Sequence, residues 1–318
     1  MDRAVTVACV QAEPVILDRE RTIDKLEGLA SEAAGNGAEL VVFPETFVPV
    51  YPSSAWAKAF AGWQNDGAKE TFARIAQNSV AVGSPAEQRL AACAHELGIW
   101  LVTGVNEVES ERPGTIYNAL LYHAPDGSLA LHHRKLVPTN HERLIWGQGD
   151  GRGLTAVETG FGRLGGLVCW ENYMPLARFA LYEAGVEIYV ASTADDSDAW
   201  QATLVHIARE SRSYVVSPCA IQHASSYPAD FPLRAELDGA GMLGRGGSAI
   251  LAPDGSYLAG PLYDEEGILY AELDPTTLLA ERQRFDPVGH YHRPDVLRLG
   301  VSPSARAGDA TPSTRPSA

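Results

Sequence analysis

The chain has 318 residues, of which 45% are hydrophobic and 20% charged, a composition typical of globular proteins that excludes disorder throughout. Its 25 Lys and Arg against 40 Asp and Glu give a formal net charge of −15, and a surface of that sign repels nucleic acid and anionic membranes. No apolar run reaches the roughly 20 residues of a bilayer span, and the N-terminal run is too short for a signal peptide. We therefore expect a cytoplasmic protein with no nucleic-acid or membrane partner.

Strand-like and helical patterns alternate along the first half of the chain, as in α/β proteins. The pattern begins β–α–β, with a strand at 5–11, a helix at 18–34 and a buried strand at 40–45. Helical patterns continue to residue 97. Strands are then predicted at residues 99–108, 115–123 and 128–136, the last two joined by a Pro-Asp-Gly turn typical of a hairpin.

A glycine-rich stretch at residues 138–153 predicts a long loop, and long loops inside compact domains are often functional. The second half repeats the earlier rhythm, with strands at 160–170, 186–192 and 213–221 and helices at 175–183 and 200–211. We interpret residues 1–300 as a single domain with a duplicated core. Residues 301–318 are rich in Ser, Pro, Ala and Gly, a composition that predicts a disordered tail.

Three reactive side chains each follow a predicted buried strand, where α/β proteins tend to carry their sites. Glu45 lies at the end of an apolar strand, where partial desolvation raises the pKa of its carboxyl and suits it to act as a general base. The alternative is that Glu45 caps a helix or loop. Lys135 is either a snorkelling surface lysine or the partner of an anion. Cys169 lies at a strand-to-helix turn, where backbone N–H groups favour a thiolate and stabilise developing negative charge.

Other cysteines, histidines and glycine motifs give weaker signals. Cys9, Cys93 and Cys219 lie within apolar patterns and are interpreted as core residues. His132 and His133 are neighbours in a strand and point to opposite faces, so they cannot share a metal or a thiol. We expect no metal and no cofactor, and the GxGxxG at residues 239–244 precedes a strand rather than a helix, which argues against a bound dinucleotide. The Cys169 segment lacks GxSxG spacing, which argues against an α/β-hydrolase.

Taken together, these segments resemble the nitrilase branch of the carbon–nitrogen hydrolase superfamily. The motifs occur in the usual order of the family, from residue 4 to about residue 300. They are VVFPETF at residues 41–47, HRKLVPTNHERLIWGQGDG at 133–151, GGLVCWENYMPLAR at 165–178 and GHYHRPDVLRL at 289–299. Trp170 after the cysteine favours nitrilases, because amidase branches commonly have tyrosine there.

The resemblance implies a four-layer α–β–β–α sandwich with a catalytic triad of Glu45, Lys135 and Cys169. It further implies that Glu142 supports the lysine, although a loop ion pair with Arg143 or another cation is the alternative. The backbone N–H of Trp170 is expected to help bind the oxyanion. The implied reaction hydrolyses a small-molecule nitrile with water to a carboxylic acid and ammonia, through a cysteine thioimidate and thioester.

Two alternatives to a nitrilase remain open from the sequence: an amidase or carbamoylase of the same superfamily, and a non-catalytic assembly module with the same fold. The resemblance also implies a homo-oligomer that builds from dimers to larger spiral assemblies. The aromatic residues Phe47, Tyr51, Trp56 and Trp200 either line a substrate pocket or belong to the core or an interface. The sequence alone does not decide between a pocket, a core and an interface position for these aromatic residues.

Overall fold

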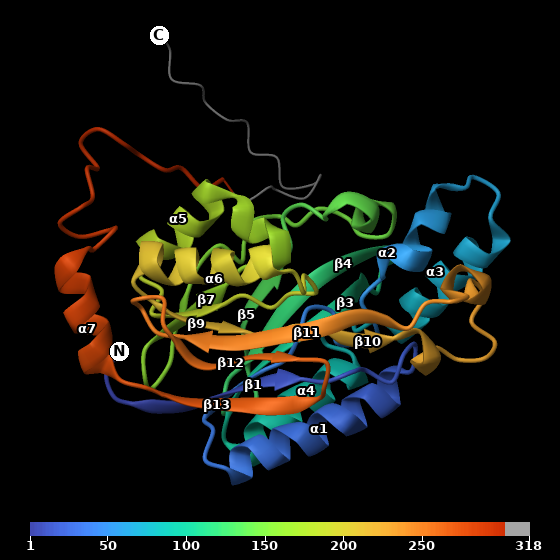
Figure 1. The fold of residues 1–318 in the computed structure, drawn as a ribbon, viewed down its shortest axis with the longest axis horizontal. Helices are drawn as coiled ribbons and strands as arrows, with labels where there is room; N and C mark the ends of the chain where they lie inside the picture. Colours follow the sequence, from blue (N-terminus) through green and yellow to red (C-terminus); the bar gives the residue numbers. More distant parts are fainter. Residues whose placement is uncertain (303–318) are drawn as a thin grey trace.

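The computed structural model describes residues 1–302 of the chain (Figure 1). The predicted tail at 301–318 therefore lies, from residue 303 onward, outside the described residues. Within the described part, the strands form two mixed sheets. The helices are α1 (Arg19–Gly35), α2 (Ser54–Ala57), α3 (Asp66–Asn78), α4 (Pro85–Leu97), α5 (Pro175–Glu183), α6 (Asp198–Ser211) and α7 (Pro275–Arg284).

The first sheet comes mostly from the N-terminal half. Its order is β13-β1-β2-β3-β4-β5. Strands β1, β2 and β3 are parallel, whereas β3, β4 and β5 form an antiparallel meander and β13 returns antiparallel to β1. The bounds are β1 (Val5–Gln11), β2 (Leu40–Val42), β3 (Trp100–Glu109), β4 (Arg112–His123), β5 (Leu129–Arg134) and β13 (Gly267–Leu273).

The second sheet comes from the C-terminal half. Its order is β10-β11-β9-β8-β7-β6, with β12 also pairing with β11. Strands β7, β8 and β9 are parallel, as the predicted β–α–β rhythm requires. The bounds are β6 (Val157–Glu158), β7 (Arg163–Gly166), β8 (Ile188–Val190), β9 (Tyr214–Ser217), β10 (Ile221–His223), β11 (Met242–Leu251) and β12 (Tyr257–Tyr263).

The two sheets pack face to face, and helices cover both outer faces. The central core joins residues of both sheets, such as Val7 and Val42 from the first and Ile188 and Val216 from the second. Helices α1 and α4 bury their apolar faces on the outside of the first sheet, and α5 and α6 do the same on the second (Figure 1). This arrangement confirms the predicted α–β–β–α sandwich. The assignment of residues 1–300 to one domain stays a prediction.

Several predicted strands are shorter than expected; those at 40–45 and 186–192 are strands only over Leu40–Val42 and Ile188–Val190. The stretch at 213–221 divides into β9 and β10 around Pro218, because proline has no N–H to donate to a sheet. The stretch at 160–170 is a strand only over Arg163–Gly166, and the chain enters a short 3₁₀ turn at Cys169–Tyr173. Further 3₁₀ turns lie at Lys58–Ala61, Asn140–Leu144, Ala224–Ser226 and Arg234–Leu237. None of the helices in residues 1–302 has the length and apolar character to cross a membrane.

Candidate active site

The three strand-end side chains predicted from the sequence lie in one buried cluster. Glu45 follows β2, Lys135 directly follows β5 and Cys169 follows β7 of the other sheet. Their solvent-exposed fractions are 1%, 1% and 3% respectively. The site is therefore assembled across the interface between the two sheets, with the first sheet supplying the carboxylate and the amine and the second supplying the thiol.

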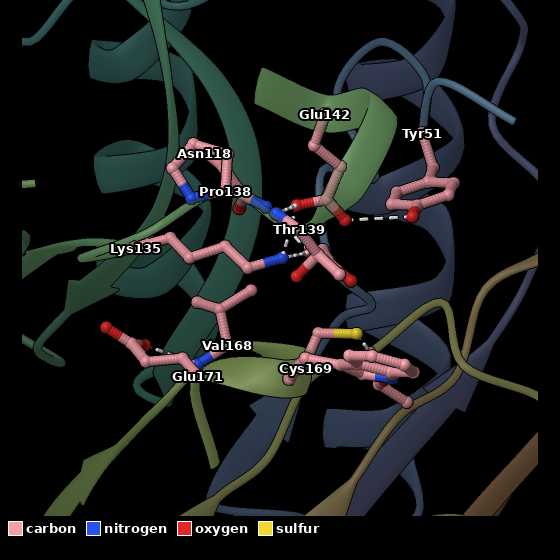
Figure 2. Close-up of polar contacts among 12 residues, drawn as sticks. Tyr51, Asn118, Lys135, Pro138, Thr139, Glu142, Val168, Cys169 and Glu171 are labelled. Carbon is pink, nitrogen blue, oxygen red and sulfur yellow. Dashed lines mark hydrogen bonds and ion pairs between the residues drawn. The ribbon is translucent and has the colours of Figure 1, made fainter. Parts of the chain in front are cut away.

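The ammonium of Lys135 joins two carboxylates. Its Nζ lies 2.8 Å from Glu45 Oε1 and 2.7 Å from Glu142 Oε2, and Figure 2 shows the amine directed toward Glu142 with Cys169 on the opposite side. Glu142 is 1% exposed, and Arg143 donates instead to the carbonyl of Pro138. Of the cations considered in the alternative, Glu142 thus pairs with Lys135 in the buried cluster and not with Arg143 in the loop.

Further donors fix the two carboxylates. The side-chain amide of Asn118 donates to Glu45 Oε1 at 2.6 Å. The Tyr51 hydroxyl donates to Glu142 Oε1 at 2.9 Å and the backbone N–H of Thr139 donates to its Oε2 at 2.6 Å (Figure 2). These bonds leave little rotational freedom to either acid.

One oxygen of Glu45 remains without a partner. Among the described residues, its buried Oε2 has no hydrogen-bond partner. Glu45 also lines a cavity of about 10 Å³ together with Phe47, Tyr51 and Gln222, a volume close to that of one water molecule. A buried carboxylate oxygen without a donor is placed to accept a proton from a reacting group.

The electrostatics of the cluster follow from its burial. Burial raises the pKa of the Glu45 carboxyl, an effect that Lys135 opposes and the charge of Glu142 reinforces. Burial alone would lower the pKa of Lys135, but the two carboxylates outweigh it and hold that pKa above its usual value. Lys135 therefore stays an ammonium, and Glu45 is a stronger base than an exposed glutamate.

Cys169 begins the 3₁₀ turn in a left-handed backbone conformation, with φ at 52°. Such a conformation is uncommon for a residue with a side chain and is typical of functional sites. Burial raises the pKa of the thiol, Glu45 raises it further and Lys135 lowers it. Burial therefore opposes the thiolate that backbone donors of the turn would favour, and the thiol needs a base to lose its proton.

Trp170 follows the cysteine and is half-exposed. Its indole N–H donates to Asp195 Oδ2 at 2.6 Å, and its ring packs edge-on against Tyr173. The side chain therefore points outward, while the backbone N–H belongs to the turn that begins at Cys169. A role for that N–H in binding an oxyanion stays a prediction.

The remaining aromatic residues divide between the site and the core. Tyr51 and Phe47 line the small cavity at Glu45. Trp56 is fully buried, and its indole N–H donates to the hydroxyl of Tyr227 at 2.6 Å in a separate apolar cluster. Trp200, in the first turn of α6, is likewise fully buried. Trp56 and Trp200 are thus core residues.

Sequence reasoning missed two polar residues of the site, Asn118 and Thr193. Asn118 lies in the buried part of β4. A polar residue within an otherwise apolar strand is a signal in the sequence that could have identified it. The hydroxyl of Thr193 donates to the Cys169 sulfur at 3.1 Å and accepts the N–H of Asp195 at 2.9 Å. Thr193 also follows a buried strand, β8, so the position after a strand that identified Glu45, Lys135 and Cys169 could have identified it as well.

The histidines that adjoin the lysine do not reach the thiol. His132 Nε2 lies 2.7 Å from Glu107 and His133 Nε2 lies 2.9 Å from Glu171, so the two rings contact different partners, as alternation along β5 predicts. Over residues 1–302, no group of His, Cys, Asp and Glu side chains has an arrangement suited to a metal ion.

Over most of its length the chain is similar to known proteins of one family. The carbon-nitrogen hydrolase family matches residues 6–283. An aliphatic nitrilase of Sinorhizobium fredii is 43% identical over 96% of this chain and 97% of its own length. A bifunctional nitrilase/nitrile hydratase of Nicotiana tabacum is 40% identical over 93% of this chain and 86% of its own length.

Among solved structures, a carbon-nitrogen hydrolase from Helicobacter pylori superposes with a TM-score of 0.71 at 21% identity, covering 92% of this chain and 97% of that one. At that identity the likeness concerns the fold alone. The family match over most of the chain, and the high identity of relatives aligned almost end to end, are decisive for membership. The chain belongs to the carbon–nitrogen hydrolase family and, within it, to the nitrilase branch.

Proposed function

We propose that this protein is a nitrilase that hydrolyses an organic nitrile to the carboxylic acid and ammonia. The observation that carries the proposal is the 43% identity to an aliphatic nitrilase, aligned over 96% of the chain. The site geometry supports it, because a thiol, a base and a fixed ammonium share one dehydrated space. No cofactor enters the proposed chemistry.

In the first step, the Cys169 sulfur attacks the nitrile carbon while Glu45 accepts the thiol proton and passes it to the nitrile nitrogen. The C–S bond that forms gives a covalent thioimidate. The unpartnered Oε2 of Glu45 is suited to this proton transfer, and Asn118 and Lys135 hold the other oxygen. The base is needed because the resting thiol is dehydrated and protonated.

In the second step, water that Glu45 deprotonates adds to the thioimidate carbon, and the tetrahedral intermediate expels ammonia to leave a thioester. A second water then releases the carboxylic acid and restores the thiol, so that one nitrile consumes two waters. The ammonium of Lys135 and the N–H of Trp170 stabilise the tetrahedral anion, where a single donor is typically worth about 3 kcal/mol. Glu142 keeps the lysine aligned by accepting its second hydrogen bond.

The decisive assay offers a nitrile and its matching amide side by side and follows acid, amide and ammonia by chromatography. A nitrilase turns over the nitrile and barely hydrolyses the amide, whereas an amidase or carbamoylase shows the reverse. Turnover of neither, together with no reaction of Cys169 with iodoacetamide, identifies a non-catalytic module. Some amide product from the nitrile is compatible with the mechanism, because the tetrahedral intermediate forms it when it expels the thiol instead of ammonia.

The proposal extends to substrate range and assembly. A panel of benzonitrile, phenylacetonitrile, aliphatic dinitriles and cyanide defines which nitriles are accepted. We also propose that the protein is a cytoplasmic homo-oligomer. Exposed apolar side chains on α5 and the C-terminal segment, among them Leu176 and Leu297, support an interface there. Size-exclusion chromatography with electron microscopy measures the assembly.

A further inference from the structure

Glu171 lies two residues after the nucleophile and, unlike Glu45 and Glu142, does not contact Lys135. It is 2% exposed, and its carboxylate contacts segments that the sequence places far apart. Oε1 accepts the backbone N–H of Leu136 at 2.8 Å, and Oε2 accepts the backbone N–H of Val168 at 2.9 Å. Leu136 directly follows the lysine, and Val168 directly precedes the cysteine (Figure 2 shows the contact with Val168).

His133 completes this arrangement. Its Nε2 lies 2.9 Å from Glu171 Oε2, and neither side chain is accessible to solvent. Burial alone would raise the pKa of Glu171, but His133 and the two backbone donors outweigh it and hold that pKa below its usual value. The carboxylate is therefore ionised, and because an ionised carboxylate can only accept hydrogen bonds, the imidazole N–H is the donor.

We propose that Glu171 is a positioning residue that clamps the lysine segment of one sheet to the nucleophile turn of the other. The inference rests on the proposed function for its catalytic consequence. A carboxylate reaches both backbone amides at once, so the positions of Lys135 and Cys169 are tied through their immediate neighbours. Displacements of about 1 Å between reacting groups lower rates by about 100-fold, and a single buried acid restrains that displacement here.

The Glu171→Gln variant removes this bridge without changing the size of the side chain. An amide has one acceptor oxygen and one NH₂ group, so either orientation turns a donor toward the N–H of Leu136 or of Val168. One of the two segments is released. Glu171→Asp is a second variant that keeps the charge and both acceptors but is one methylene too short to hold both amides, and it decides the question if the glutamine variant does not fold.

The chain offers a matched control in Glu87. This buried glutamate of α4 also pairs with a histidine, His123 Nε2 at 2.7 Å, and accepts the N–H of Gly83 at 3.1 Å. In the described part of the chain, its hydrogen bonds reach neither the lysine segment nor the nucleophile turn. Glu87→Gln therefore reproduces the loss of a buried glutamate–histidine pair and its effect on Tm, while leaving the site intact.

The experiment measures kcat and KM for a nitrile, and the pH dependence of Cys169 alkylation by iodoacetamide, followed by peptide mass spectrometry. We expect Glu171→Gln and Glu171→Asp to lower kcat by about 10- to 100-fold with little change in KM. The alkylation midpoint should move by about 0.5 pH unit or more as Cys169 shifts relative to Glu45 and Lys135. Glu87→Gln should retain the kcat and the alkylation midpoint of the wild type.

Wild-type kcat and an unmoved alkylation midpoint in the Glu171 variants overturn the proposal, and so does a change confined to KM. Equal loss of kcat in Glu87→Gln also overturns it, because the effect is then one of general stability. The alkylation readout needs no nitrile. If the wild type alkylates at Cys169 but turns over no nitrile, the proposed function fails, and the alkylation midpoints still decide whether Glu171 positions the cysteine.

Discussion

The Nζ atom of Lys135 lies 2.8 Å from Oε1 of Glu45, and both side chains are fully excluded from solvent. Two opposite charges in a dehydrated space stabilise each other, but each becomes costly when its partner is removed. The pair also prepares the site for chemistry, because the lysine holds one carboxylate oxygen and leaves the other without a donor. The predictions on catalysis and stability follow from this relationship.

Glu45→Gln keeps the volume of the side chain and an acceptor for Asn118, but removes the base. We expect kcat for a nitrile to fall by about 10²- to 10⁴-fold, the usual contribution of general acid–base catalysis. Steady-state kinetics measure the loss. Glu39→Gln is the control, since Glu39 pairs with Arg3 at the surface, and its kcat should match the wild type. A Glu45→Gln enzyme with nearly full activity would show that another group is the base.

Lys135→Met tests the stability of the cluster as well as its activity. The substitution leaves Glu45 and Glu142 buried without their cation, and breaking a buried ion pair costs about 3–5 kcal/mol of unfolding free energy. Urea denaturation of the wild type and the variant gives the difference. Lys69, which pairs with Asp66 on the surface, provides the control: Lys69→Met should leave the free energy of unfolding nearly unchanged. Equal stability of the two variants contradicts the cluster described here.

Thr193→Val removes the hydroxyl that donates to the Cys169 sulfur. That donor stabilises the thiolate, so its loss raises the pKa of the thiol above its already elevated value. At a fixed pH we expect alkylation of Cys169 by iodoacetamide to slow by about tenfold, the worth of a hydrogen bond to a charged group. Thr22→Val, which removes a buried hydroxyl in α1, serves as the control. An unchanged alkylation rate in Thr193→Val contradicts the role of this donor.

Glu107 makes stability depend on pH. Burial alone would raise the pKa of this carboxyl, but the hydrogen bonds from Arg134 and His132 outweigh it and lower that pKa. A carboxyl with a lowered folded pKa contributes stability above its unfolded pKa, near 4.3 for glutamate, and loses it as the pH falls through the folded value.

Glu107→Gln should therefore destabilise the protein at pH 7 and flatten the acid side of its stability curve. Urea denaturation between pH 7 and pH 3 measures both effects. Glu109→Gln is a neighbouring comparison, since Glu109 binds the same guanidinium through another nitrogen and is more exposed. If the stability of Glu107→Gln falls with decreasing pH as steeply as that of the wild type, Glu107 is not the source of this pH dependence.

Much of the fold follows from local pattern. Apolar runs identify most strands, and the end of α5 at Glu183 agrees with the predicted helix at 175–183. The break at Pro218 was missed although the proline is visible in the sequence. The short β7 was missed because sheet pairing decides how far an apolar run stays a strand. The pairing of β13 with β1 joins distant segments, and no local pattern encodes it.

Part of the site could also be predicted from local sequence pattern. Glu45, Lys135 and Cys169 each follow a buried strand, and the strand-end rule found them individually. Their meeting across two sheets, and the pairing of Glu142 with Lys135, rested on resemblance to a family rather than on the residues alone. Asn118 was missed because its role depends on which way its side chain points from β4, which register decides. Thr193 follows β8, as the three predicted residues follow their strands, and was missed although that signal was present.

The Cys169→Ala variant tests whether Cys169 forms the covalent intermediate of nitrile hydrolysis. Alanine removes only the sulfur, so circular dichroism and the elution volume should match those of the wild type. The measurement is the release of carboxylic acid and ammonia from a nitrile that the wild type hydrolyses. We expect no release above the uncatalysed background, whereas release at the wild-type rate would show that Cys169 is not the nucleophile.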